Sequence, residues 1–192
     1  ESDNSILHLP FPLPWDDLDA ENTYQSFAKN LGNLAETYGF DPESDIRGIV
    51  METFQGWGAL FYPQSYIDAI KDFMKRSDVL LCFDEMQAGF GRTGKLFGYQ
   101  HYNIEPDLIC CGKGISSSLP LSAILGRADI LDLPGSGNMS STHSANPLCC
   151  AAAHASFKFI LDNNLITNSK ELGDLMLSEL NRMKETYRNI SY

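Results

Sequence analysis

Helical periodicity accounts for much of the hydrophobic pattern of this chain. Apolar residues three and four positions apart share one face between Thr23 and Tyr38, and Gly39 follows as a helix cap. A second apolar stripe begins at Pro63, since proline favours the first turn of a helix. Two further helices are predicted, from Asn146 to about Asp162 and onward from a capping box of Asn168 and Glu171.

Short, continuous apolar runs alternate with these helices and predict strands. The runs occupy residues 46–52, 79–83, 107–111 and 121–125. Because they contain few polar positions, we expect strands buried on both faces, and therefore an α/β domain around a mainly parallel sheet. Ligands of such sheets bind beyond the carboxyl ends of the strands. This rule makes Glu52, Asp84 and Lys113 candidate site residues.

Composition limits the kinds of partner. The chain has 192 residues, with 25 acidic and 14 basic side chains and a net charge of −11. Phosphates would be repelled, so we expect no nucleic-acid partner and no anionic membrane surface. The chain has no apolar run near the ~20 residues that span a bilayer, and its acidic start is unlike a signal peptide. Residues 1–22 are rich in proline and aspartate and are predicted to form an extended arm.

The cysteines indicate a reducing compartment. Cys82 and the vicinal pairs at 110–111 and 149–150 lie in apolar stretches, without a C-x-x-C pair or a secreted disulfide framework. We expect buried free thiols and a cytoplasmic protein. No metal site is predicted, because the chain does not offer ligands at suitable spacings.

Residues 79–94 match two known motifs, but the surrounding sequence lacks the elements that each motif requires. The segment Gly89 to Gly94 matches the G-x-G-x-x-G of dinucleotide-binding loops, but residues 84–88 separate it from the strand and no helical face follows. The acidic pair Asp84-Glu85 after an apolar run resembles the acidic strand of an ATPase. That reading needs a companion G-x-x-x-x-G-K-[ST] loop, which the chain lacks.

A third interpretation joins Lys113 to Asp84. Lys113 lies between two glycines after an apolar strand, and a desolvated amine is a nucleophile toward carbonyls. Pyridoxal phosphate needs such an amine and also a carboxylate against its pyridine nitrogen, which Asp84 is placed to supply. The spacing is equally compatible with a salt bridge from Lys113 to Asp84 or Asp107.

Five blocks of the sequence share the residues and the order of one enzyme family. They occupy residues 49–56, 83–94, 105–107, 112–114 and 141–148, and Asp84, Lys113 and Thr142 follow one another at intervals of 29 residues. The blocks resemble the class III pyridoxal-phosphate aminotransferases, the fold type I family of the 4-aminobutyrate, ornithine and acetylornithine enzymes. The resemblance implies a three-layer αβα large domain. Residues 1–162 would belong to this cofactor-binding domain, and 163–192 would form a helix leading toward a C-terminal small domain absent from the chain.

The resemblance also implies roles for single residues. Lys113 would carry the cofactor as an aldimine and shuttle a proton, and Asp84 would keep the pyridine nitrogen protonated. Met86 stands where the family has Val or Ile against a ring face. Gln87 would approach the ring oxygen of the cofactor, although it could instead cap the loop.

Two more residues would lie at the periphery of the site. By resemblance, Thr142 donates to the cofactor phosphate of the neighbouring subunit in a homodimer, and Glu52 lies near the substrate. Alternatively, Thr142 simply precedes the Asn146 cap, and Glu52 is a solvated carboxylate at a strand end. The residues after Glu52 and around Thr142 depart from the family pattern, which affects loop shape and substrate choice rather than the cofactor.

The activity implied is transamination, from an omega-amino acid or related amine donor to a 2-oxo acid. An aminomutase, racemase or decarboxylase on the same scaffold, or a non-catalytic fragment, are the alternatives. The family's phosphate-binding turn and the aromatic residue that stacks on the cofactor have no counterpart before Ile46. The chain therefore resembles a central fragment of the large domain, and by itself is expected to bind pyridoxal phosphate weakly and to be inactive.

Overall fold

A four-stranded sheet forms the centre of the computed structural model, which describes residues 5–13 and 19–190. In spatial order the strands are β1 (Gly48–Glu52), β4 (Leu80–Asp84), β5 (Leu108–Cys111) and β6 (Ala123–Gly126). The first three are parallel and β6 is antiparallel, so the predicted mainly parallel sheet is confirmed. A small hairpin of β2 (Phe54–Gln55) and β3 (Leu60–Phe61) follows β1.

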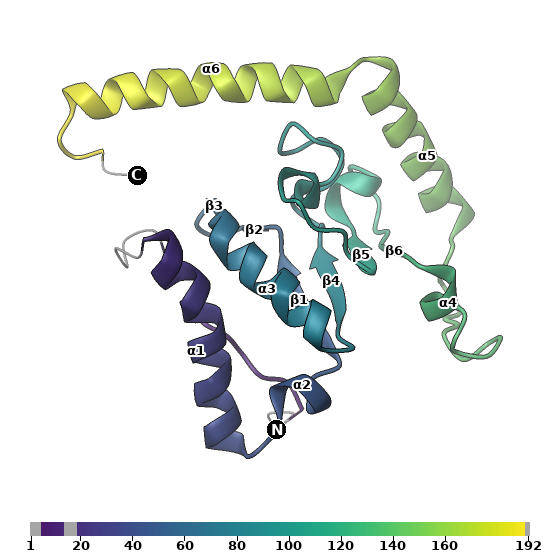
Figure 1. Ribbon diagram of the computed structural model, residues 1–192. Coiled ribbons are helices and arrows are strands. Elements are labelled where there is room, and N and C mark those ends of the chain that lie inside the picture. Colours follow the sequence, from purple (N-terminus) through teal and green to yellow (C-terminus); the bar gives the residue numbers. More distant parts are fainter. Residues whose placement is uncertain (1–4, 14–18, 191–192) are drawn as a thin grey trace.

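Helices connect these strands and extend beyond them (Figure 1). They are α1 (Ala20–Tyr38), α2 (Pro42–Asp45), α3 (Gln64–Arg76), α4 (Ala128–Leu131), α5 (Pro147–Asp162) and α6 (Leu165–Thr186), with the 3₁₀ turns η1 (Gly98–His101) and η2 (Lys113–Ile115). Helices α1 and α3 pack together on one side of the sheet, whereas α6 runs along the outer end of the molecule (Figure 1). The architecture is a partial αβα fold. In the described ranges, no helix combines the length and apolar character needed to cross a membrane.

The hydrophobic core lies between the sheet and helices α1 and α3. Alternate strand residues point into it, and Leu81 and Phe83 are 0% exposed. The helices contribute Phe27, Tyr66 and Phe73, with the ring of Phe27 centred 5.6 Å from Tyr66 and 5.7 Å from Phe73 in edge-on contacts. Each large apolar side chain buried here stabilises the fold by about 1.5–3 kcal/mol.

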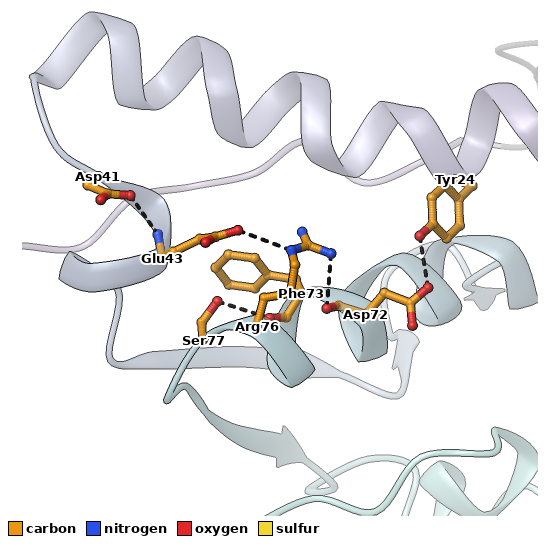
Figure 2. Close-up of polar contacts among 7 residues, drawn as sticks. All are labelled: Tyr24, Asp41, Glu43, Asp72, Phe73, Arg76 and Ser77. Carbon is orange, nitrogen blue, oxygen red and sulfur yellow. Dashed lines mark hydrogen bonds and ion pairs between the residues drawn. The ribbon is translucent and has the colours of Figure 1, made fainter.

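Polar contacts at the rim of this core join α1, α2 and α3 (Figure 2). The Tyr24 hydroxyl of α1 donates to Asp72 of α3 at 2.9 Å, and Arg76 Nε of α3 lies 3.0 Å from Glu43 Oε1 of α2. Solvent screens these exposed pairs. They therefore orient helices that apolar packing already holds together.

The opposite face of the sheet is largely exposed, and we call it the open face. Val50 on β1 is 74% exposed and Ile124 on β6 is 53% exposed, while Cys82 and Cys110 are half-buried. The expectation that the strands are buried on both faces is therefore wrong for this chain. The physical reason is that α5 and α6 lead away from the sheet instead of packing over this face (Figure 1).

Helix α1 begins earlier than the sequence pattern indicated. It starts at Ala20 rather than Thr23, because the Asp19 carboxylate accepts the Asn22 N–H at 2.7 Å and caps the first turn. Residues 20–22 of the predicted extended arm therefore belong to α1, and the described residues 5–13 form no helix or strand. The rest of that arm lies outside the described residues.

The start of α6 also differs from the prediction. The helix begins at Leu165, so Asn168 and Glu171 lie within it and do not form the expected capping box. Asn164 takes a left-handed backbone conformation, with φ of 51°, and turns the chain directly from α5 into α6. The Asn146 cap of α5 is confirmed, because its side chain accepts backbone N–H groups of the first helical turn.

Candidate active site

Three parallel strands bring the predicted residues to one end of the sheet. Glu52 at the end of β1 is the register partner of Asp84 at the end of β4, and Asp84 is the register partner of Cys110 in β5. Register partners share a face, so both carboxylates lie on the open face. Lys113 follows in η2, the turn directly after β5. The expected grouping of Glu52, Asp84 and Lys113 is therefore present.

Lys113 has an exposed side chain and a strained backbone. Its φ is 40°, a left-handed value that costs a lysine about 1–3 kcal/mol and that is found mostly at functional sites. Over the described ranges Lys113 forms no ion pair, and Asp107 instead binds Arg127 Nη1 at 3.0 Å. The alternative salt bridge is thus not formed. The expected desolvation is not seen either, because the open face leaves this side chain in solvent.

The Asp84 carboxylate is held by the backbone that follows it. Its Oδ1 accepts the Met86 N–H at 2.9 Å, and its Oδ2 makes no hydrogen bond within the described part of the chain. The Met86 side chain lies over Gly112, since a Cβ at Gly112 would be 3.4 Å from the Met86 sulfur. A half-buried carboxylate and an apolar side chain therefore flank the turn that carries Lys113.

Glu52 and Gln87 meet at Gly56. Glu52 Oε2 accepts the Gly56 N–H at 3.3 Å, which ties the end of β1 to the next turn. A Cβ at Gly56 would be only 2.6 Å from Gln87 Oε1, so the observed position of Gln87 requires glycine there. Gln87 and Glu52 thus both approach Gly56, Gln87 with the end of its side chain and Glu52 through a hydrogen bond.

The glycine-rich segment 89–94 docks on α6 and does not open a dinucleotide-binding helix. Gly94 has a φ of 79°, and a Cβ there would be 2.9 Å from the Cβ of Lys170. The Ser169 hydroxyl donates to the Arg92 carbonyl at 3.3 Å. These glycines therefore allow a loop next to the site to approach a helix closely.

Thr142 is not brought to this group. It is exposed in the segment between α4 and α5, and within the described residues no hydrogen bond or ion pair joins it to Glu52, Asp84 or Lys113. Its predicted role in a neighbouring subunit stays a prediction.

The Cys82 thiol beneath the site is a poor nucleophile. The sulfurs of Cys82 and Cys110 lie 3.6 Å apart on the open face. Burial, with smaller contributions from Cys110 and Asp84, raises the pKa of the Cys82 thiol to about 12. Cys82 therefore stays protonated near neutral pH and does not compete with Lys113 as a nucleophile. Among residues 5–13 and 19–190, His, Cys, Asp and Glu do not gather in groups of three that could hold a metal.

Sequence reasoning missed the importance of Glu85. This side chain is 0% exposed, and burial raises its pKa while N–H groups of Gly98 and Tyr99 oppose the shift. The usable signal was the adjacency of Asp84 and Glu85 at a strand end, because successive side chains point to opposite faces. One acidic residue thus reaches the open face and the next one reaches the core.

Comparison with known proteins gives the same family across the chain. A family model described as aminotransferase class-III matches residues 2–192. An alanine/serine racemase of Pyrococcus horikoshii is 32% identical over 193 residues, covering 97% of this chain and 40% of that protein. A 4-aminobutyrate aminotransferase of Mycobacterium tuberculosis is 34% identical over 188 residues, covering 93% of this chain and 41% of that protein.

Solved structures agree in fold. An S-selective transaminase from an Arthrobacter species superimposes with a TM-score of 0.76 at 34% identity, covering 85% of this chain and 35% of that one. An ornithine aminotransferase of Toxoplasma gondii superimposes with a TM-score of 0.70 at 30% identity, covering 85% and 36%. The chain spans about 40% of the length of the curated relatives it matches. By sequence and by fold, this chain belongs to the class III aminotransferase family.

Proposed function

We propose that this chain supplies the lysine and the carboxylates of a pyridoxal-phosphate-dependent transaminase. The enzyme would move an amino group from an omega-amino acid or related amine to a 2-oxo acid. The observation that carries the proposal is the strand register, which sets Asp84 at the same end of the sheet as the turn holding Lys113. Within the described residues neither side chain is neutralised by an ion pair, so both are available to a ligand.

The residues present fit this cofactor. When bound, pyridoxal phosphate supplies an aldehyde that bonds to an amine and a ring that withdraws electrons from the substrate. Lys113 offers the amine, and the second oxygen of Asp84 offers an acceptor for a protonated ring nitrogen. Met86 offers an apolar surface beside the lysine turn. The description of another solved ornithine aminotransferase structure from Toxoplasma gondii, 30% identical to this chain, places the cofactor at its active site, which supports the assignment.

Each side chain then has a distinct task. The Lys113 amine would bond to the cofactor aldehyde and would hold and move the proton at the substrate carbon. Asp84 would hold the protonated ring nitrogen through a charge-assisted hydrogen bond. Gln87 would approach the ring oxygen of the cofactor, and Glu52, at the end of β1, would lie near the substrate.

Titration of the full-length protein with pyridoxal phosphate tests this function. We expect a new visible absorption band and amino-group transfer to a 2-oxo acid from at least one donor among 4-aminobutyrate, ornithine and alanine. The Lys113→Ala variant should show neither. A protein that binds the cofactor but transfers no amino group would overturn transamination, and a protein that does not bind it would overturn the whole proposal.

Racemisation is the second candidate, because the alanine/serine racemase relative matches 97% of the chain. Racemisation would use the same lysine to remove the proton from one face of the substrate carbon, and a second acid would have to deliver a proton to the other face. Incubation of L-alanine without any 2-oxo acid separates the two activities. Appearance of D-alanine under those conditions would favour racemisation, whereas a strict need for the 2-oxo acid would favour transamination.

We also propose a cytoplasmic homodimer whose active sites are shared. Thr142 is exposed in the segment between α4 and α5 and is therefore accessible to a neighbouring subunit, which supports a role in the other subunit's site. The described cysteines are all free thiols, which favours a reducing compartment.

Subunit complementation tests the shared site. Mixed dimers of Lys113→Ala and Thr142→Ala subunits contain one intact site if Thr142 serves its partner. We then expect activity to reappear on mixing two inactive proteins. If mixing restores nothing while mixed dimers form, Thr142 does not act across the interface.

For the domain organisation, we propose that residues 1–162 belong to the cofactor-binding domain and that α6 leads toward a second domain. Support comes from the second half of α6, where Leu175 is 58% exposed and Met176 is 65% exposed. Limited proteolysis of the full-length protein should cut between the two parts and release a stable fragment that ends near α6.

A further inference from the structure

Glu85 is a buried carboxylate that has no basic partner among residues 5–13 and 19–190. The side chain is 0% exposed, and its two oxygens are used separately. Oε2 accepts the Gly98 N–H at 2.8 Å, and Oε1 accepts the Tyr99 N–H at 2.7 Å. A carboxylate taken out of water is costly unless hydrogen bonds replace its hydration. This arrangement therefore needs a purpose beyond filling space, which an apolar side chain would serve better.

The backbone of Glu85 is fixed as firmly as its side chain. Its N–H donates to the Cys110 carbonyl at 2.9 Å, which extends the pairing of β4 and β5 beyond the strand end. Its own carbonyl accepts the Gly89 N–H at 2.9 Å. The Thr53 hydroxyl lies beside the carboxylate from the end of β1 and favours its charged form, although its oxygen forms no hydrogen bond of normal geometry in the described ranges.

These contacts pin both ends of one loop. Residues 86–97 leave the sheet at Glu85 and return at Gly98, so the carboxylate closes the loop at its base. The loop begins with Met86 and Gln87, and the Met86 N–H is the group that orients the Asp84 carboxylate. Any movement of the loop base therefore moves the residues assigned to the cofactor.

We propose that Glu85 is a positioning residue, whose carboxylate binds the Gly98 and Tyr99 amides and thereby holds the Asp84–Gln87 turn in place for the cofactor. This inference rests on the proposed pyridoxal-phosphate site. Glu85 does not touch that site, because it points to the core face while Asp84 points to the open face.

The chemistry explains why an acid is needed here. Both partners of Glu85 are N–H donors, and an ionised carboxylate is a pure acceptor with two oxygens. Glutamine has the same shape but offers one oxygen and one donor, so one amide would face another donor and stay unpaired. Glu85→Gln is therefore a near-isosteric change that breaks the clamp.

The test measures cofactor affinity and amide exchange in the full-length, cofactor-free protein. In Glu85→Gln we expect the dissociation constant for pyridoxal phosphate to rise at least tenfold, and hydrogen exchange at Gly98, Tyr99 and Met86 to accelerate. Ser77→Ala is the matched control, because it removes a buried hydrogen bond to Phe73 at the end of α3, away from this loop. Its cofactor affinity should change less than twofold even if its thermal stability falls.

The possible results distinguish the positioning role of Glu85 from the proposed function. Equal cofactor affinity in Glu85→Gln and wild type would overturn the positioning role while leaving the proposed function intact. Failure of the wild-type protein to bind pyridoxal phosphate would instead overturn the proposed function. If Glu85→Gln does not fold, wild-type exchange decides: the Gly98 and Tyr99 amides should exchange at least tenfold more slowly than the amide of the exposed Lys95. Exchange as fast as at Lys95 would refute the clamp.

Discussion

The two faces of the sheet differ in what their side chains do. On the core face, Leu81 and Phe83 are 0% exposed and pack under α1 and α3. On the open face, Val50 is 74% exposed and the strands end in Glu52 and Asp84. The same five-residue strands build both faces, because alternate side chains point in opposite directions. Residues that stabilise the core and residues placed for chemistry therefore alternate along the same strands.

This separation continues past the strand ends. Asp84 turns to the open face, and its second oxygen has no hydrogen-bond partner in the part of the chain that the structure describes, whereas Glu85 turns to the core with both oxygens paired. Of these two neighbouring acids, Asp84 is therefore placed to bind a ligand, whereas Glu85 binds backbone groups of the protein itself. Substitutions on the two faces should consequently change different measured quantities.

The largest expected effect is on the open face at Lys113. The Lys113→Ala variant should lose covalent attachment of pyridoxal phosphate and all transamination, because no other amine lies in the turn after β5. Its thermal stability should stay close to that of the wild type, because the side chain is exposed and alanine keeps the same Cβ on the same left-handed backbone. Lys95→Ala, an exposed lysine of the neighbouring loop, serves as the control and should retain both properties.

Truncating one apolar side chain on each face should show that the loss of stability depends on how deeply the side chain is buried. Leu81→Ala creates a cavity in the core and should lower the free energy of unfolding by about 2–5 kcal/mol. Val50→Ala on the adjacent strand should lower it by less than about 1 kcal/mol, because most of that side chain is already in water. Chemical denaturation of both variants measures this difference. Equal losses would mean that the open face is covered in solution.

The Asp84→Asn variant should slow the chemical step while leaving the fold intact. A charge-assisted hydrogen bond to the ring nitrogen is worth about 1.5–3 kcal/mol, which corresponds to a rate loss of roughly tenfold or more. Single-turnover kinetics with a saturating amino donor measures it. Asp78→Asn, an exposed acid ahead of β4, is the control, and equal rates in the two variants would remove Asp84 from the mechanism.

A smaller effect is expected at Gly56. Its Cβ in Gly56→Ala would collide with Gln87 Oε1 and push that side chain away. We expect cofactor affinity to fall several-fold, or about 1 kcal/mol. Gly32→Ala in α1 is the matched control, since a Cβ there meets nothing within 4 Å and the change should stabilise the helix. Unchanged affinity in Gly56→Ala would show that Gln87 does not contribute to binding.

Sequence pattern predicted the parts of this molecule that depend on local periodicity. The strand ends at Glu52 and Asp84, and the turn at Lys113, follow from apolar runs and from the rule that ligands bind beyond carboxyl ends. The family resemblance is confirmed over the chain. The strand ends can be predicted from residues that are neighbours in the sequence, and the family can be predicted from the spacing of its motifs.

The features that the sequence did not reveal depend on contacts between distant segments. An apolar run such as 79–83 looks the same whether one face or two are covered, so the open face could not be foreseen. The role of Glu85 requires knowing that Gly98 returns to the base of the loop. The start of α6 was not predicted because the left-handed backbone of Asn164 turns the chain there, and hydrophobic periodicity gives no sign of such a turn.

Whether Lys113 is the amine that carries the cofactor can be determined by chemical trapping. Reduction of the cofactor-loaded, full-length protein with borohydride fixes pyridoxal phosphate to the amine that holds it, and peptide mapping then identifies that residue. We expect a single modified peptide, labelled at Lys113. Stoichiometric label at Lys95 or at any other lysine, with Lys113 unmodified, would contradict it.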